Sequence, residues 1–182
     1  MIDTQIKIVL LDEADPTNLG VTGNFSALMQ ASSAPFAMFA SWDDLWYPDK
    51  VSKSLKAMKA LENRRGQGCP LLIHTDLRMV DANLRELRRS VSDRLRHVDS
   101  NTRTVSKFLL ENTAPGCAII TNRSLLNLAM PIPCPARCED WWLALVASAF
   151  GEIEFCAEVC IDWAEARCQR LDYSSARCAI PS

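Results

Sequence analysis

The chain has 182 residues, 48% of them hydrophobic and 23% charged, and its formal net charge is −2. This length predicts one domain with a core of its own, and the ordinary hydrophobic fraction excludes a disordered chain. A near-neutral charge balance gives no electrostatic reason to expect nucleic-acid binding, which relies on clustered lysines and arginines. The basic runs at 64–65 and 85–96 are more typical of solvated faces than of binding patches.

No stretch of the sequence approaches the ~18 consecutive apolar residues that a membrane-spanning helix needs. Residues 1–7 also lack the pattern of a signal peptide, so we expect a cytoplasmic protein. Its eight cysteines are then more typical of reduced thiols than of a disulfide framework. The pairs Cys134/Cys138 and Cys156/Cys160 have no histidine nearby in sequence, which disfavours a structural metal.

The first half of the chain alternates predicted strands and helices. Residues 6–11 form a short apolar run closed by a turn, which predicts a strand. A helix capped by Asn24 should follow, because apolar residues then recur at spacings of three and four. The continuous apolar run 35–40 predicts a second, buried strand, and residues 50–65 have the apolar face of a helix.

The second half continues this alternation. We expect, in order, a strand at 71–76 running on towards 81, a charged surface excursion at 83–101, a helix at 105–111, a strand at 116–121, a helix at 123–129, the strongest helix at 140–150, and a last strand from 153. Strands that alternate with helices predict an α/β sandwich with a partly parallel sheet. In such sheets, functional sites lie at the carboxyl ends of the strands.

Two adjacent carboxylates, Asp43 and Asp44, follow the second predicted strand. At the carboxyl end of a strand such a pair can hold Mg²⁺ or Mn²⁺, and this cation can bridge the oxygens of a diphosphate. The alternative is a turn or a helix cap, where adjacent aspartates are common. Trp42 and Trp46 flank the pair and offer flat faces for a sugar or base, although both can equally belong to the core.

A second group of candidate residues begins the strongest predicted helix, and it comprises Glu139, Asp140, Trp141 and Trp142. The helix dipole keeps a carboxylate ionised at this position, so the carboxylate can act as general base toward an acceptor hydroxyl. The alternative is an N-terminal helix cap, with both tryptophans in the core.

His74 and Asp76 form a third candidate pair, which we expect at a strand end. A histidine beside an aspartate is more often a hydrogen-bonded structural residue than a catalytic dyad. The motifs of serine hydrolases, P-loop kinases, zincins and dinucleotide-binding domains do not occur in the sequence.

Five short segments of the sequence matter as an ordered set: Asn18–Val21 with Asn24–Phe25, Ser41–Lys50, His74–Asp81, Gly116–Cys117 and Asp140–Leu145. Together they resemble family 2 glycosyltransferases of the GT-A fold, above all the bacterial rhamnosyltransferase-like members that build surface polysaccharide. The resemblance covers roughly residues 6 to 160, which predicts a glycosyltransferase-like domain at 1–160 that is incomplete at its N-terminus. It implies a partial GT-A, Rossmann-like α/β/α sandwich with a mostly parallel sheet that lacks the usual first strands. Residues 161–182 would be a divergent C-terminal tail.

The resemblance implies an inverting transfer from a nucleotide-diphosphate sugar to a saccharide acceptor, either a polysaccharide or a lipid-linked one. Asp43 would bind the divalent cation, Mg²⁺ or Mn²⁺, and Asp140 would be the general base. The donor nucleotide would lie near Asn18, Gly20 and Asp44. The acceptor side would comprise His74, Asp76, Glu139, Trp141 and Trp142.

The sequence departs from the family pattern in two places. Ser41 stands where the family has the first aspartate of its D-x-D motif, and a hydroxyl is a poorer ligand for a hard cation. The chain is also expected to start after the family's first strand, helix and second strand, so an upstream segment, a complementing chain or a homodimer partner would supply them. The alternative to a transferase is a non-catalytic remnant that binds a partner or carbohydrate, and any membrane contact would be peripheral.

Overall fold

The computed structural model describes residues 19–41, 43–90, 105–133, 136 and 138–164. In chain order the elements are α1 (Gly20–Ala31), β1 (Phe36–Met38), β2 (Leu45–Trp46), α2 (Lys50–Arg65), β3 (Leu71–Val80), β4 (Glu86–Arg88), α4 (Val105–Leu110), the 3-10 turn η1 (Gly116–Ala118), β5 (Ile119–Asn122), α5 (Arg123–Ala129), α6 (Glu139–Phe150) and β6 (Glu152–Ala164). The predicted α/β class is confirmed. The strand predicted at 6–11 lies outside the described residues.

The sheet is mixed rather than mostly parallel. Its strand order is β1-β5-β3-β6-β2, and β4 adds to β3 as a hairpin. Among the described strands only β3 and β6 pair in parallel, whereas every other pairing is antiparallel. The expectation of a mostly parallel sheet is therefore wrong for this part of the chain. Local apolar patterns show where strands lie, but the direction of each pairing depends on which distant strand becomes the neighbour.

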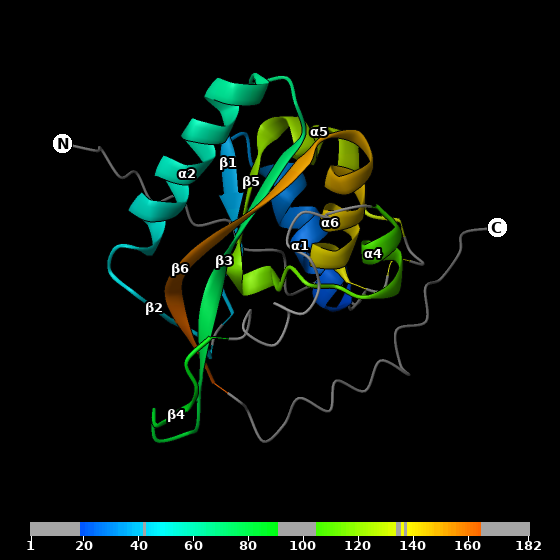
Figure 1. Ribbon diagram of the computed structural model, residues 1–182. Coiled ribbons are helices and arrows are strands. Elements are labelled where there is room, and N and C mark those ends of the chain that lie inside the picture. The colour runs from blue at the N-terminus through cyan, green and yellow to red at the C-terminus, as the bar shows by residue number, and fades with distance from the viewer. Residues whose placement is uncertain (1–18, 42, 91–104, 134–135, 137, 165–182) are drawn as a thin grey trace.

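Helices cover both faces of the sheet, so the molecule has three layers (Figure 1). Alternate residues of a strand point to opposite faces. Leu72, Ile119 and Ile153 pack into the larger core cluster with residues of α1, α4, α5 and α6. Their neighbours Leu71 and Ile73 point the other way and pack against the underside of α2. This alternation explains why short, continuous apolar runs form the inner strands.

Two predicted boundaries need correction. The first helix begins at Gly20 rather than after a cap at Asn24, which lies inside α1. The Thr22 hydroxyl donates a hydrogen bond to the Glu139 carboxylate, at 3.2 Å, so contact with α6 helps to hold the first turn of α1. Residues 116–118 form η1 rather than the start of a strand, because the N–H of Gly116 is taken by Asp140.

The last strand is longer than its sequence indicates. β6 runs to Ala164, past residue 160, where the tail was expected to begin. Its polar residues obscure the strand pattern, but pairing with the long strand β3 satisfies the backbone of both. Residues 165–182 lie outside the described part of the chain.

A close approach of two backbone segments joins α6 to the sheet. The N–H of Glu152 donates to the carbonyl oxygen of Pro70 at 3.0 Å. A Cβ atom built on Gly151 would lie 1.7 Å from that same carbonyl oxygen. Only glycine fits at position 151, since any side chain would overlap with the backbone of Pro70.

Candidate functional site

The candidate site is built around η1, whose successive residues reach acidic side chains from two other segments. The N–H of Gly116 donates to Oδ2 of Asp140 at 2.8 Å. A Cβ atom on Gly116 would lie 3.2 Å from the same oxygen, so the absence of a side chain permits this close approach. On the neighbouring residue, the Cys117 thiol lies beside the Asp44 carboxylate. The turn therefore connects two carboxylates that are almost a hundred positions apart in sequence.

Asp140 is held at both of its oxygens. Besides the bond from Gly116, its Oδ1 accepts a hydrogen bond from the N–H of Trp141 at 2.6 Å, at the first turn of α6. The Cys138 thiol also interacts with this carboxylate, and burial together with that contact raises the pKa of Cys138 to about 12. The two backbone donors fix the orientation of the Asp140 carboxylate.

Asp44 lies in a less polar setting. Both of its carboxylate oxygens are buried, and no described residue gives them a hydrogen bond of ordinary geometry. The thiol of Cys117 and the hydroxyl of Ser41 are near enough to favour the charged form, but burial and the charge of Asp43 outweigh them and raise the pKa of Asp44. A nearby cation stabilises the ionised form of such a buried carboxylate.

Lys50 provides one positive charge beside this carboxylate. It is the first residue of α2 and is fully buried. Its Nζ donates to the carbonyl oxygen of Cys117 at 3.1 Å and lies 4.8 Å from the centre of the Trp46 ring. Burial lowers the pKa of Lys50, whereas the nearby Asp44 favours its charged form. A buried charge of this kind is stable only with such partners.

A third segment reaches the same region through Glu139. This side chain is buried, accepts the hydrogen bond from Thr22, and has a pKa raised by burial. Thr22 is in the first turn of α1, so the start of α1, including Gly20, lies next to the start of α6. Gly20 has a φ of +64°, a conformation in which glycine is favoured.

The structure thus gathers five of the predicted site residues near η1 and the adjoining helix starts: Gly20, Asp43, Asp44, Glu139 and Asp140. Asn18 and Trp42 lie outside the described residues. His74 and Asp76 lie within β3 rather than at a strand end, which corrects that expectation. The strand does not end there because β6 continues alongside it as far as Val80.

The remaining candidates have structural contacts. The His74 ring packs against Phe155 with ring centres 5.1 Å apart. Asp76 accepts a 2.5 Å hydrogen bond from the Ser90 hydroxyl. The indole N–H of Trp142 donates to the carbonyl oxygen of Ala129 at 2.8 Å, and that of Trp141 donates to the carbonyl of Phe108. Both tryptophans therefore anchor α6 to neighbouring helices.

The sequence reasoning missed Lys50, Gly116 and Cys117 as parts of the site. All three lie inside segments that carry the family resemblance, and this was the available signal. A lysine at the start of an amphipathic helix is normally solvated, so its burial could not be read from local pattern. It depends on Cys117, which lies far along the chain.

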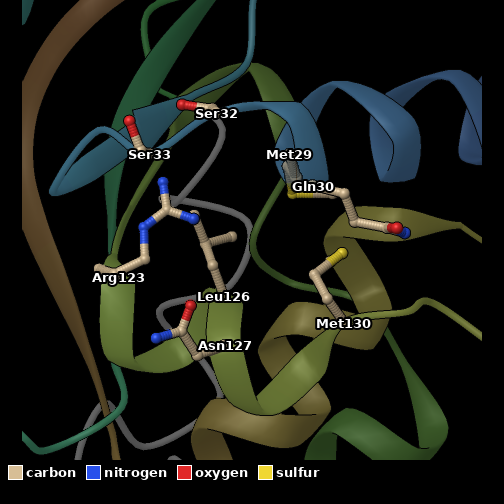
Figure 2. A pocket seen from close by; sticks show the side chains of 8 residues that line it. All are labelled: Met29, Gln30, Ser32, Ser33, Arg123, Leu126, Asn127 and Met130. Atoms are coloured by element: carbon tan, nitrogen blue, oxygen red, sulfur yellow. The ribbon is translucent and has the colours of Figure 1, made fainter.

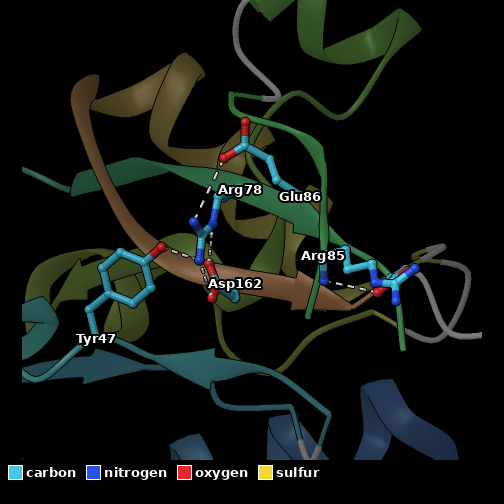
Figure 3. Close-up of polar contacts among 6 residues, drawn as sticks. Tyr47, Arg78, Arg85, Glu86 and Asp162 are labelled. Atoms are coloured by element: carbon cyan, nitrogen blue, oxygen red, sulfur yellow. Dashed lines mark hydrogen bonds and ion pairs between the residues drawn. The ribbon is translucent and has the colours of Figure 1, made fainter. Parts of the chain in front are cut away.

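Close to the acidic pair, a polar network ties three strands together (Figure 3). Arg78 of β3 makes two hydrogen bonds to the carboxylate of Asp162 of β6, at 2.8 and 2.7 Å. The Tyr47 hydroxyl, directly after β2, donates to the same carboxylate at 2.6 Å. The bidentate pair fixes the Asp162 carboxylate. The bond from Tyr47 to this carboxylate then holds the segment that follows Asp43 and Asp44.

The stability of this network should depend on pH. Arg78 and Tyr47 hold the pKa of Asp162 below its ordinary value of 3.8. The stabilisation is then complete above the unfolded-state pKa and is lost as the pH falls through the lower, folded-state pKa. We expect Asp162→Asn to reduce the free energy of unfolding by about 2 kcal/mol at pH 7, with the half-exposed Arg78 limiting the effect.

Urea unfolding at pH 7 and at pH 3 and below tests this prediction. The difference between the wild-type protein and Asp162→Asn should shrink at the acid end. A suitable control is Glu158→Gln, which alters an exposed ion pair with Lys53 and should leave stability nearly unchanged. A difference that stays constant across this pH range would contradict the prediction.

A separate hollow lies at the opposite end of β5 (Figure 2). It has a volume of about 530 Å³ and is lined by Met29, Gln30, Ser32, Ser33, Arg123, Leu126, Asn127 and Met130. Nε of Arg123 donates to the carbonyl oxygen of Ala34 at 2.8 Å, so this cation helps to close the turn before β1. The hollow is therefore distinct from the carboxylates near η1.

No protein-family model matches the chain, and no curated protein matches it. In the described ranges no helix is both long and apolar enough to cross a membrane. The same part of the chain holds no cluster of three or more histidine, cysteine or acidic side chains arranged for a metal ion.

Asp43 and Asp44 nevertheless suit a cation that is held jointly by the protein and by the phosphate groups of a bound substrate. Mg²⁺ is often held by one or two carboxylates, with phosphate oxygens and water completing its coordination. Asp43 and Asp44 could supply those carboxylates, and the unsatisfied oxygens of Asp44 support this assignment. Lys50 partly compensates the same charge, so it would compete with the metal for Asp44.

Proposed function

We propose that the chain is an inverting glycosyltransferase that uses a nucleotide-diphosphate sugar and a hydroxyl acceptor. The observation that carries the proposal is that Asp140 and Asp44 contact two consecutive residues of η1, Gly116 and Cys117 respectively. Asp44 would help to hold a cation, and Asp140 is a carboxylate fixed at the start of a helix. Displacement of a diphosphate by a hydroxyl needs such a separation of roles.

Asp140 would act as the general base. As the acceptor oxygen attacks the anomeric carbon, its proton moves to the Asp140 carboxylate and the bond from that carbon to the diphosphate breaks. The nucleoside diphosphate leaves with the bonding electron pair, and the anomeric centre is inverted because the acceptor oxygen attacks the face opposite the leaving diphosphate. The backbone bonds from Gly116 and Trp141 would orient the carboxylate for this proton transfer.

Asp43 and Asp44 would hold the divalent cation, Mg²⁺ or Mn²⁺, that neutralises charge on the diphosphate when it is bound. Lys50 would add a fixed positive charge behind Asp44. Gly20, at the start of α1, would lie near the donor nucleotide, and Glu139 would border the acceptor side. A rhamnosyltransferase-like GT-A fold, a saccharide or lipid-linked acceptor and a cytoplasmic location belong to the same proposal.

A non-catalytic binding domain is the second candidate. The observation that favours it is the contact of Lys50 with the acidic region, together with the raised pKa of Asp44. Both features weaken binding of a metal cation at Asp44. Such a domain would keep the nucleotide or sugar site without turnover.

Thermal-shift measurements with nucleoside diphosphates and Mn²⁺ test the proposal. A ligand that binds only the folded state raises the melting temperature. We expect a shift of several degrees with the diphosphate and Mn²⁺ together, and a much smaller one with Asp43→Asn. Glu111→Gln, a change at an exposed carboxylate directly after α4, is the matched control.

Release of nucleoside diphosphate from a panel of nucleotide sugars then separates the two candidates. Metal-dependent release supports the transferase. A thermal shift without release, with every donor and acceptor supplied, would favour the binding domain. The absence of both a shift and release would overturn the proposed nucleotide site.

A further inference from the structure

The β3–β4 hairpin projects from the body of the molecule, beyond the sheet and its covering helices (Figure 1). All residues from 82 to 89 are exposed, and they include two leucines. Leu84 is 58% exposed and Leu87 is 50% exposed. Single exposed leucines are ordinary, but two of them on a projecting hairpin place apolar area outside the core formed by the described residues.

The tip of this hairpin is well ordered by its own hydrogen bonds. The Asp81 carboxylate accepts from the N–H groups of Asn83 and Arg85, at 2.8 and 2.9 Å. The carbonyl oxygen of Asp81 accepts from the N–H of Leu84 at 2.9 Å, and the N–H of Asp81 donates to Arg85 at 3.0 Å. A three-residue loop of this type ends in a left-handed residue, a position normally occupied by glycine.

Leu84 occupies that left-handed position, with a φ of 60°. A branched apolar residue is disfavoured there, and its side chain gains no contact with the core. Leu87 lies at a bulge, since Met79 pairs with Arg88 and Val80 pairs with Glu86. Bulges re-aim side chains. The hairpin therefore displays both leucines outward at a conformational cost.

The charges around the two leucines are mainly positive. Arg85, Arg88 and Arg89 are exposed on the tip, whereas Glu86 is the only acidic residue between positions 82 and 89. The Glu86 carboxylate also lies 3.7 Å from Arg78, so part of its charge is already compensated. This excess of positive charge beside the two leucines contrasts with the net charge of −2 of the whole chain.

We propose that the β3–β4 hairpin binds the surface of a membrane that contains anionic phospholipids. Leu84 and Leu87 insert among the acyl chains near the headgroups, while Arg85, Arg88 and Arg89 contact lipid phosphates. Apolar insertion and electrostatic attraction act together in such binding. The exposed leucines favour a lipid surface over a nucleic acid, for which arginines alone would suffice.

The hairpin continues β3 beyond η1, because the Thr75 hydroxyl of β3 approaches the carbonyl of Ala118 at 3.5 Å. Membrane contact through the hairpin would hold the end of the sheet that carries the candidate site near the bilayer. The inference does not depend on glycosyl transfer, since it rests only on the hairpin's residues and can be tested without nucleotide.

Vesicle co-sedimentation tests this proposal. The probes are phosphatidylcholine vesicles with about a third phosphatidylglycerol, and phosphatidylcholine vesicles alone. We expect binding to the anionic vesicles that weakens at high salt, and little binding to the neutral ones. Leu84→Gly and Leu87→Ser should each weaken binding about tenfold, as should the double variant Arg88→Glu/Arg89→Glu.

Leu84→Gly makes the test independent of folding, because glycine suits the left-handed position and should leave the melting temperature unchanged or higher. The matched controls are Leu128→Ser, an equally exposed leucine on α5, and Lys56→Glu/Lys59→Glu on α2. These controls should bind the anionic vesicles nearly as well as the wild-type protein. Absent binding, binding unaffected by the hairpin changes, or binding equally weakened by the controls would overturn the proposal.

Discussion

Asp140→Asn should reduce glycosyl transfer by a factor of about 10² to 10⁴, the usual contribution of a positioned general base. The amide has nearly the same shape as the carboxylate, and its oxygen can still accept one of the two backbone hydrogen bonds from Gly116 and Trp141. It cannot take a proton from the acceptor hydroxyl. Initial rates of nucleoside diphosphate release, measured with saturating donor and acceptor, give the comparison.

The control for this substitution is structural. Circular dichroism and the melting temperature of Asp140→Asn should stay close to those of the wild-type protein, because the lost interaction is one hydrogen bond at a half-buried helix start. Glu111→Gln should retain full activity. A variant that keeps its fold and releases nucleoside diphosphate as fast as the wild-type protein would remove Asp140 from the proposed mechanism.

Gly151→Ala should destabilise the protein more than any other substitution suggested by the structure. The added methyl group would lie 1.7 Å from the carbonyl oxygen of Pro70, far inside the contact distance of real atoms. The conflict is with backbone, so a change of rotamer cannot relieve it. We expect a loss of about 3 kcal/mol or more in the free energy of unfolding.

Gly68→Ala is the matched control, since a Cβ atom there would have no other atom within 4 Å. Urea denaturation of both variants gives the test. Gly68→Ala should lie within about 1 kcal/mol of the wild-type protein, because an exposed Gly-to-Ala change in an open position has a small effect. Equal stability of the two variants would mean that α6 and β3 can separate at no cost.

Much of the secondary structure could be predicted from the sequence. The helix predicted at 123–129 has those bounds, and those predicted at 50–65, 105–111 and 140–150 agree to within one residue. The expected extension of the third strand towards residue 81 is confirmed by β3. The spacing of apolar residues in these segments is enough to predict whether each one forms a helix or a strand.

The parts that could not be predicted depend on distant partners. Lys50 is buried because Trp46 and the carbonyl of Cys117 surround its ammonium group. Gly116 does not join the strand, because its N–H donates a hydrogen bond to the Asp140 carboxylate. The long polar strand β6 is recognised only through its pairing with β3. Each depends on a contact that no short window of sequence contains.

For the candidate site, the sequence indicated residues but not their arrangement in space. The residue types and their order pointed to Asp43, Asp44 and Asp140, but whether the chain would bring them together was a question of tertiary structure. The short turn at 116–118 answers it by contacting Asp140 and Asp44 through neighbouring residues. The strand pattern already ran on towards residue 81, so His74 and Asp76 belong to the interior of β3 and not to a strand end.

The pairing of β3 with β6 has a consequence for synthesis of the protein. Leu71 lies opposite Glu152, and Val80 lies opposite Ala164, so the two longest strands meet only after a long intervening stretch has been made. While the ribosome is still adding that stretch, β4 and β5 can pair with one edge of β3, but the edge that later pairs with β6 has no strand partner. Closing such distant segments is slow, and exposed strands aggregate readily. Chaperone binding to the emerging polypeptide should therefore matter most before residue 164 leaves the exit tunnel.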